Sequence, residues 1–172
     1  GRLREIPLVR GIRRLLQSET DDAFCLRPEF VRGVRQLARH RYTFDLCILH
    51  RQLANAIRLV RQCPDVRFVL DHAGKPAIQD RRTEPWRAEL KELSQEPNVV
   101  CKLSGLVTEA DHARWTPADL RLYIDHVVEC FGFDRILFGG DWPVSTQATD
   151  YPRWVATVDE ARALVENDPT VQ

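Results

Sequence analysis

The residues best suited to chemistry follow a short apolar segment near the end of the chain. Residues 135–138 are followed by Gly139, Gly140 and Asp141, and then by Pro143. In parallel α/β sheets the carboxyl ends of the strands open into the ligand-binding crevice. Glycines there let a ligand or the backbone come close, so Asp141 is placed to bind a ligand or to move a proton. Taken alone, the pattern fits a turn aspartate that caps the next segment equally well.

A second apolar segment ends in Asp71 and His72, and Gly74 and Pro76 follow it. Because parallel strands present their carboxyl ends at one edge of a sheet, we expect His72 to lie at the same rim as Asp141. A histidine and an aspartate together can ligate a divalent metal or share proton transfer. Taken alone, His72 fits a histidine satisfied within the core better than a site residue.

A third segment, residues 98–105, places Lys102 inside an otherwise apolar strand. A buried ammonium group without a partner costs several kcal/mol or loses its proton, so Lys102 needs a counter-charge. Taken alone, Lys102 fits better with the alternative, a surface lysine whose stem covers apolar neighbours. Three segments that end alike favour one shared site over three separate structural roles.

The elements that must position these residues alternate along the chain. Alternating strands and helices predict a parallel sheet with right-handed crossovers. Thr116 suits an N-cap, and Pro28 and Pro117 suit the first turn of a helix. The hydrophobic pattern predicts strands at residues 8–15, 43–49, 66–71, 99–103 and 135–138, and helices at 28–39, 52–62, 86–94, 117–130 and 151–165.

Composition indicates one globular domain in 172 residues, of which 44% are hydrophobic and 29% charged. The 25 basic and 25 acidic residues cancel, which does not indicate nucleic acid or an anionic membrane as a partner. No apolar stretch approaches the ~20 residues that span a bilayer, and the first residues lack a signal-peptide core. Five cysteines without a CxxC pair indicate reduced thiols, so we expect a cytoplasmic protein.

Length leaves two α/β architectures open. A (β/α)8 TIM barrel takes about 250 residues, or about 31 per unit, so this chain matches a partial barrel of about five βα units. Five strands cannot close that barrel. The chain enters its first strand directly, which favours the C-terminal part of a larger barrel. The alternative, an open five-stranded doubly wound sheet, is the one that length alone favours.

Five motifs follow one another at barrel-like spacing: residues 9–16, 44–46, 68–76, 101–106 and 139–144. Together they resemble the amidohydrolase-related (amidohydrolase 2) family over nearly the whole chain. The resemblance is strongest to the TIM-barrel branch of sugar lactonases, which includes L-fucono- and L-rhamnono-lactonases and the pyrone-dicarboxylate lactonase. It implies that residues 1–172 are the C-terminal portion, strands four to eight, of a single barrel domain.

The resemblance also implies roles for individual residues. Asp141 resembles the strand-eight aspartate, which is the general base for the attacking water and, in metal-dependent members, a metal ligand. His72 resembles the histidine after strand six, which helps bind metal or polarises the substrate carbonyl. Arg13 resembles an arginine that binds substrate oxygens, although a surface ion pair is its alternative. Lys102 and Trp142 are pocket-lining candidates by position alone.

The chain departs from this family in one respect. The family's first strand carries a His-x-His pair, and this sequence contains none. Metal dependence varies within the resembled branch. The resemblance therefore leaves open whether a divalent metal such as zinc is bound, with Asp141 and His72 as its candidate ligands.

For the complete protein the resemblance implies a hydrolase that opens a sugar lactone, a small-molecule cyclic ester, with water that Asp141 deprotonates. One alternative is a metal-dependent decarboxylase of the same superfamily. Another is a non-catalytic binding protein, for which the absent His-x-His pair is the supporting feature. Charged rim segments at residues 79–84 and 108–114 are candidate substrate contacts, although solvated turns are the commoner role. The substrate and the oligomeric state stay open.

Overall fold

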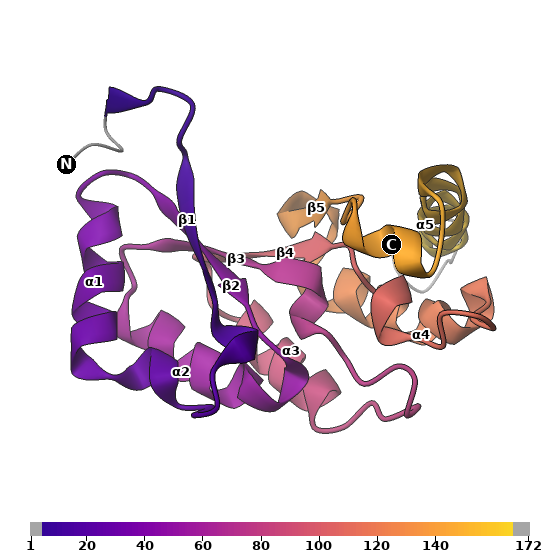
Figure 1. Ribbon diagram of the computed structural model, residues 1–172, viewed down its shortest axis with the longest axis horizontal. Helices are drawn as coiled ribbons and strands as arrows, with labels where there is room; N and C mark the ends of the chain where they lie inside the picture. Colours follow the sequence, from indigo (N-terminus) through magenta and orange to yellow (C-terminus); the bar gives the residue numbers. More distant parts are fainter. Residues whose placement is uncertain (1–4, 167–172) are drawn as a thin grey trace.

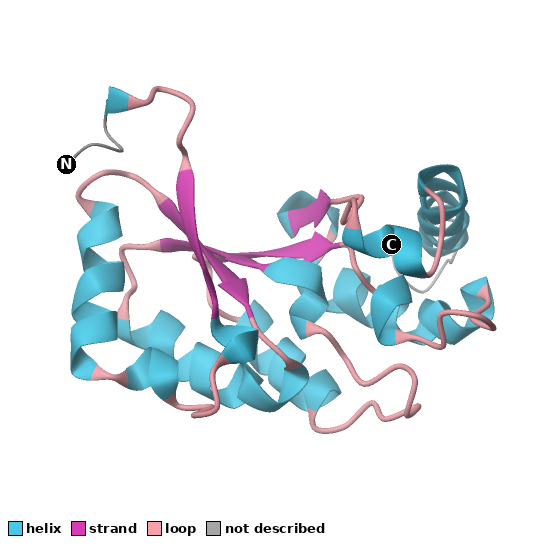
Figure 2. Cartoon of the chain, viewed as in Figure 1, coloured by secondary structure: helices cyan, strands magenta, loops and turns pink. Residues whose placement is uncertain are grey.

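Five parallel strands form one sheet, and their order in space is their order in the chain. The computed structural model describes residues 5–166 (Figures 1 and 2). Every pair of neighbouring strands is parallel. The strands are β1 (Gly11–Leu15), β2 (Thr43–Cys47), β3 (Arg67–Leu70), β4 (Val99–Leu103) and β5 (Ile136–Phe138).

One helix follows each strand, and consecutive helices pack against one another from α2 to α5. Figure 1 shows α2, α3 and α4 on one side of the sheet. None of the helices within residues 5–166 has the length and hydropathy needed to cross a membrane. The helices are α1 (Pro28–Ala38), α2 (Leu53–Gln62), α3 (Trp86–Ser94), α4 (Pro117–Phe131) and α5 (Tyr151–Glu166).

The strand order distinguishes the two architectures that length left open. A doubly wound sheet reverses its strand order at one point, and the crossovers on either side of that point place helices on opposite faces. Here the order runs from β1 to β5 without reversal. Right-handed crossovers that always move to the next strand place all helices on one face. The sheet is therefore built as consecutive βα units of a barrel, and the doubly wound alternative is wrong.

The predicted elements are confirmed, with one clear difference at the first strand. The sequence predicts a strand from Leu8, whereas β1 begins at Gly11. Strand pairing starts there, because Gly11 lies opposite Thr43, the first residue of β2. Leu8 is 88% exposed, so its apolar side chain is not buried against the sheet. The five cysteines are free thiols, in agreement with their spacing in the sequence.

The core lies between the sheet and its helices, which leaves the other face of the sheet for polar groups. In β4 the side chains of Val99, Cys101 and Leu103 are buried, whereas Val100 and Lys102 are only partly buried. This alternation follows from the period of two in a strand. Each large apolar side chain on the helix face contributes about 1.5–3 kcal/mol by its burial. The opposite face carries Lys102 and therefore holds the candidate site.

Candidate active site

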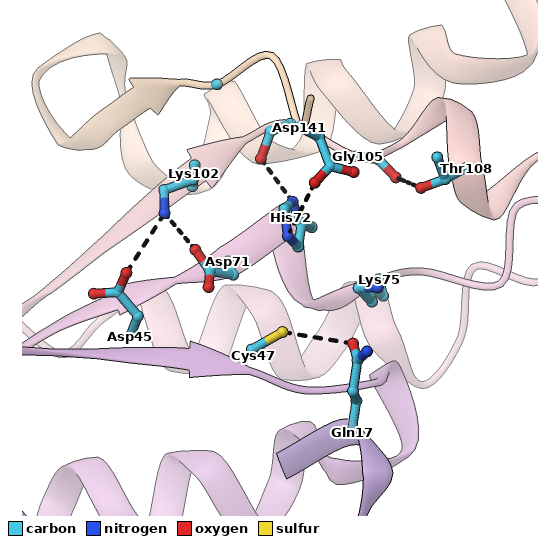
Figure 3. A network of polar contacts seen from close by, with 12 residues as sticks. Gln17, Asp45, Cys47, Asp71, His72, Lys75, Lys102, Gly105, Thr108 and Asp141 are labelled. Carbon is cyan, nitrogen blue, oxygen red and sulfur yellow. Dashed lines mark hydrogen bonds and ion pairs between the residues drawn. The ribbon is translucent and has the colours of Figure 1, made fainter. Parts of the chain in front are cut away.

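His72 and Asp141 lie side by side beyond the carboxyl end of the sheet (Figure 3). The Nε2 atom of His72 is 3.6 Å from Oδ1 of Asp141, and their side chains are only 10% and 14% exposed. His72 follows β3 and Asp141 follows β5, the two neighbours of β4. The structure thus brings together the two residues that the sequence analysis assigned to chemistry.

The backbone at both residues is left-handed. His72 has φ 55° and Ala73 has φ 49°, within the short turn Asp71–Gly74, and Asp141 has φ 51°. Such conformations cost non-glycine residues of order 1–3 kcal/mol each and persist where the surroundings hold them. The indole Nε1 of Trp86 donates to the Ala73 carbonyl at 2.7 Å and fixes the turn. The backbone therefore aims His72 at Asp141.

Gly105 lies against both side chains because it has no side chain of its own. A Cβ on this residue would lie 2.7 Å from Nδ1 of His72 and 3.0 Å from Oδ2 of Asp141. Its φ of 63° also favours glycine. Gly139 makes a similar approach, since a Cβ there would lie 3.0 Å from Cβ of Ser104. These glycines let the ends of β4 and β5 close around the pair.

Ser104 contacts the other nitrogen of His72. Its Oγ lies 2.8 Å from His72 Nδ1, and Ser104 is fully buried. Ser104 is not among the site residues predicted from the sequence. The one signal that marks this serine is its place directly after an apolar strand and before Gly105, at the rim where Asp141 and His72 were expected.

Lys102 is paired with carboxylates, as expected for a lysine in an apolar strand. Its Nζ lies 2.5 Å from Oδ1 of Asp71 and 3.6 Å from Oδ2 of Asp45 (Figure 3). Asp71 is fully buried and also lies 3.4 Å from Nη1 of Arg13. The Arg13 side chain is half-exposed, so this guanidinium pairs with a buried carboxylate and still faces solvent. Arg13 and Lys102 thus share one anchor beside the His72 turn.

Asp45 and Asp71 are not among the site residues predicted from the sequence, although both lie within the five motifs. Burial raises the pKa of Asp45, and the nearby charge of Asp71 raises it further, while Lys102 opposes this shift. Asp45 lies opposite Arg13 in the register of β1 and β2. Two carboxylates and two cations therefore line the face of the sheet that carries the site.

Trp142, the remaining predicted site residue, stands apart from these contacts. It directly follows Asp141, yet it is 78% exposed. Within residues 5–166 no hydrogen bond or ring contact joins Trp142 to the other predicted site residues. Its role at a pocket stays a prediction.

Burial favours the neutral form of the His72 imidazole. Burial lowers its pKa below the ordinary 6.5, while the charges of Asp141 and Asp71 oppose that shift. A neutral imidazole has one N–H donor and one nitrogen lone pair. It can therefore donate a hydrogen bond or ligate a metal, according to which nitrogen carries the proton.

Two sets of donor atoms here are candidates for a metal. Ligand atoms of Cys47, Asp71 and His72 lie within 4.8 Å of one another. However, Asp71 already holds the cations of Lys102 and Arg13. Burial, followed by the charge of Asp71, also raises the pKa of the Cys47 thiol, which disfavours the thiolate that binds metal. This first set therefore fits a metal poorly.

The second set is His72 with Asp141. Two ligand atoms of a tetrahedral zinc are roughly 3.3–3.6 Å apart, given bond lengths of about 2.0–2.2 Å. The separation of 3.6 Å between Nε2 and Oδ1 agrees with this range. A neutral histidine and a carboxylate are also donors that zinc accepts. These two residues fit part of a zinc site.

The fold and this site define the class of protein. The chain belongs to the amidohydrolase family, because the model of that family, described as Amidohydrolase, matches residues 2–172. This confirms the family that the five sequence motifs indicated.

Three curated relatives carry lactonase names. An L-fucono-1,5-lactonase from Burkholderia multivorans is 42% identical over 168 residues, which cover 92% of this chain and 54% of that protein. An L-rhamnono-gamma-lactonase from Scheffersomyces stipitis is 28% identical over 159 residues, covering 81% of this chain and 47% of that protein. The chain therefore spans about half the length of these relatives.

A solved structure matches the fold closely. The crystal structure of an amidohydrolase from Burkholderia multivorans with bound Zn aligns with a TM-score of 0.84 at 40% sequence identity. The alignment covers 90% of this chain and 57% of that one. The five-stranded sheet is thus a partial barrel of the amidohydrolase type.

Proposed function

We propose that this chain forms strands four to eight of a (β/α)8 barrel, and that the complete protein hydrolyses a sugar lactone. The observation that carries the proposal is the pairing of His72 Nε2 with Asp141 Oδ1, 3.6 Å apart, at the carboxyl edge of the sheet. Active sites of such barrels lie at this edge. The lactonase names of three relatives support the choice of substrate class, a small cyclic ester.

In this proposal Asp141 is the general base. Its carboxylate takes a proton from water as the water oxygen attacks the lactone carbonyl carbon. The bond between that carbon and the ring oxygen then breaks, the ring oxygen takes up the proton that Asp141 holds, and the product is a hydroxy acid. His72 lies beside the base and polarises the carbonyl oxygen.

The two cations orient the substrate. Arg13 is held at 3.4 Å from Asp71 with half of its side chain exposed, which leaves N–H groups of the guanidinium free for ligand oxygens. Lys102 is held by Asp71 and Asp45 and is about one-quarter exposed. Trp142 is the remaining candidate for a substrate contact, because it follows Asp141 directly.

A divalent metal such as zinc would be held by His72 and Asp141. When bound, it would supply Lewis-acid polarisation of the lactone carbonyl. The zinc in the related crystal structure supports testing this cofactor first.

The test is hydrolysis of a panel of sugar 1,4- and 1,5-lactones, with and without zinc or manganese. It compares the 172-residue chain with a protein extended at its N-terminus by three βα units. We expect turnover in the extended protein and none in the shorter chain. Turnover in the shorter chain would contradict the partial-barrel proposal. Lactone binding without turnover in both would favour a binding protein, and loss of a substrate carboxylate as CO₂ would favour a decarboxylase.

A further inference from the structure

Ser104 is a fully buried hydroxyl with one polar partner. Its Oγ lies 2.8 Å from Nδ1 of His72. Within residues 5–166, no other hydrogen bond reaches this hydroxyl. A serine hydroxyl has one hydrogen to donate and two lone pairs to accept. The single contact with His72 must therefore satisfy that hydrogen.

The contact allows two proton arrangements in a neutral imidazole. If Nδ1–H donates to Oγ, the buried O–H of Ser104 keeps no acceptor, and an unsatisfied buried donor costs free energy. If the O–H of Ser104 donates to Nδ1, the hydroxyl is satisfied and the ring proton must sit on Nε2. Hydrogen-bond satisfaction at Ser104 therefore favours the Nε2–H tautomer.

The opposite side of the ring favours the same tautomer. Nε2 faces Oδ1 of Asp141 at 3.6 Å, and Asp141 is largely buried with it. A proton on Nε2 places the positive end of the N–H dipole toward a carboxylate, whereas a lone pair there would face negative charge. Both neighbours of His72 thus agree on where its proton lies.

Gly105 keeps the ring from turning away from this arrangement. The site of a Cβ on Gly105 would lie 2.9 Å from Cγ and 2.7 Å from Nδ1 of His72, so the ring packs directly on this backbone. Rotation of the ring would separate Nδ1 from Ser104 and Nε2 from Asp141 together. The position of the imidazole is therefore set by backbone contact and its proton by the hydroxyl.

We infer that Ser104 is a positioning residue that fixes the tautomer of His72, donating to Nδ1 so that Nε2–H faces Asp141. This inference deepens the proposed lactone hydrolysis and rests on it for its catalytic consequence. A hydrogen-bond donor on His72 then lies beside the base, so one residue polarises the carbonyl while the other takes the proton. If a cation binds Nε2, the same hydroxyl can rotate and accept from Nδ1–H.

The tautomer is measured directly by two-dimensional ¹⁵N–¹H NMR of the metal-free protein extended at its N-terminus, labelled at histidine nitrogen, at about pH 8, where the ring is neutral. The His72 signals are identified by their loss in His72→Gln. We expect Nε2–H to predominate in the unmodified protein. Ser104→Ala should lower the ratio of Nε2–H to Nδ1–H about fivefold to tenfold, the value of one hydrogen bond.

Ser94→Ala is the matched control. Ser94 is also buried and its Oγ donates to a carbonyl, that of Lys91 at 2.8 Å in α3, without contact to His72. This variant should leave the tautomer ratio unchanged. A predominant Nδ1–H form in the unmodified protein would overturn the inference, even if Ser104→Ala failed to fold. An unchanged ratio in a folded Ser104→Ala variant would overturn it as well.

Lactone turnover tests the catalytic consequence separately. We expect Ser104→Ala to lower kcat about tenfold with KM changed less than about threefold, since the hydrogen bond from His72 to the lactone carbonyl is weakened and substrate binding is not. Unchanged kcat together with a shifted tautomer would remove Ser104 from catalysis. Absence of lactone turnover in the unmodified protein would contradict the proposed function and leave the NMR result to judge the tautomer.

Discussion

His72 and Asp141 meet across a strand that neither of them belongs to. Nε2 of His72 lies 3.6 Å from Oδ1 of Asp141, although β4 separates the strands that carry them. At the end of β4, Ser104 is hydrogen-bonded to the imidazole, and Gly105 packs against both side chains. The chemistry of His72 and Asp141 therefore depends on two small uncharged residues.

Gly105→Ala tests that dependence. The new Cβ would lie 2.7 Å from His72 Nδ1, so either the ring or the backbone must move. Gly132→Ala is the control, because Gly132 has a similar φ of 60° but no atom within 4 Å of its Cβ position. We expect Gly132→Ala to lower the unfolding free energy by about 1–2 kcal/mol, from backbone strain alone.

We expect Gly105→Ala to lower the unfolding free energy by about 1–3 kcal/mol more than Gly132→Ala does, the usual cost of overpacking. It should also lower lactone turnover strongly, whereas Gly132→Ala should not. Urea denaturation and steady-state kinetics measure the two effects. Equal losses in both variants would show that the close contact at Gly105 does not matter.

Asp141→Asn removes the proposed base with almost no change in size. We expect kcat for lactone opening to fall about 10²–10⁴-fold, because the amide cannot take a proton from water. Asp125→Asn, in an exposed ion pair with Arg121 on α4, makes the same change away from the site and should leave kcat within about twofold. Retention of most activity by Asp141→Asn would exclude this carboxylate as the base.

We expect Asp71→Asn to act mainly by lowering the free energy of unfolding. Asp71 is fully buried, and its loss leaves Lys102 and Arg13 without their shared carboxylate. We expect a loss of roughly 2–3 kcal/mol in unfolding free energy, below the 3–5 of a fully buried pair because Arg13 is half-exposed.

Asp45→Asn is the matched control on the neighbouring strand. Asp45 is about one-quarter exposed, lies 3.6 Å from Lys102, and carries a pKa raised by burial and by Asp71. Its replacement should change the unfolding free energy by less than about 1 kcal/mol. A larger loss for Asp45→Asn than for Asp71→Asn in urea denaturation would reverse the assignment of the anchor.

Stability should decline in mild acid because of His72. Its folded-state pKa lies below the ordinary 6.5, so the unfolded chain binds the proton more readily. The contribution of the neutral ring to the free energy of unfolding is fully present above pH 6.5 and is lost as the pH falls below that value. One such group adds a slope of up to about 1.4 kcal/mol per pH unit.

His72→Gln should remove that part of the slope, measured as unfolding free energy against pH. The exposed His112 provides the control variant, His112→Gln, which keeps His72 and should therefore keep the slope. If both variants follow the unmodified protein, burial of the imidazole is not linked to stability in this pH range.

Zinc binding should depend on His72 and not on Cys47. Asp71, the residue that would complete a site with Cys47, is already neutralised by two cations. We expect His72→Gln to weaken zinc binding to the full-length protein about tenfold or more, and Cys47→Ala to change it less than about threefold. Equilibrium dialysis with metal analysis measures both. Equal weakening by the two variants would instead favour the cysteine-containing set.

The order and type of the elements could be predicted because each carries its own pattern. The bounds of β4, Val99–Leu103, agree with the prediction, since the apolar positions alternate until Ser104 and Gly105 end the strand. The start of β1 could not be predicted from hydrophobicity, because Leu8 is apolar yet exposed. Only pairing with Thr43 decides where that strand begins.

The contacts of the site were predictable only in part. The rule that carboxyl ends share one rim was enough to bring His72 toward Asp141. The need of Lys102 for a counter-charge was also visible, but its partner was not. The choice of Asp71 depends on the register between neighbouring strands and on the left-handed turn after β3, which arise from tertiary packing. The hydrogen bond of Ser104 to His72 has the same origin.

The two outer strands bear on how the polypeptide behaves at high concentration. In the described part of the chain, β1 and β5 each pair on one side alone, and Leu15, Leu137 and Phe138 are 45%, 45% and 47% exposed. Unpaired N–H and C=O groups beside apolar side chains are a template for strand addition and aggregation. Preparations of these 172 residues should therefore become turbid as concentration rises unless both borders of the sheet are covered.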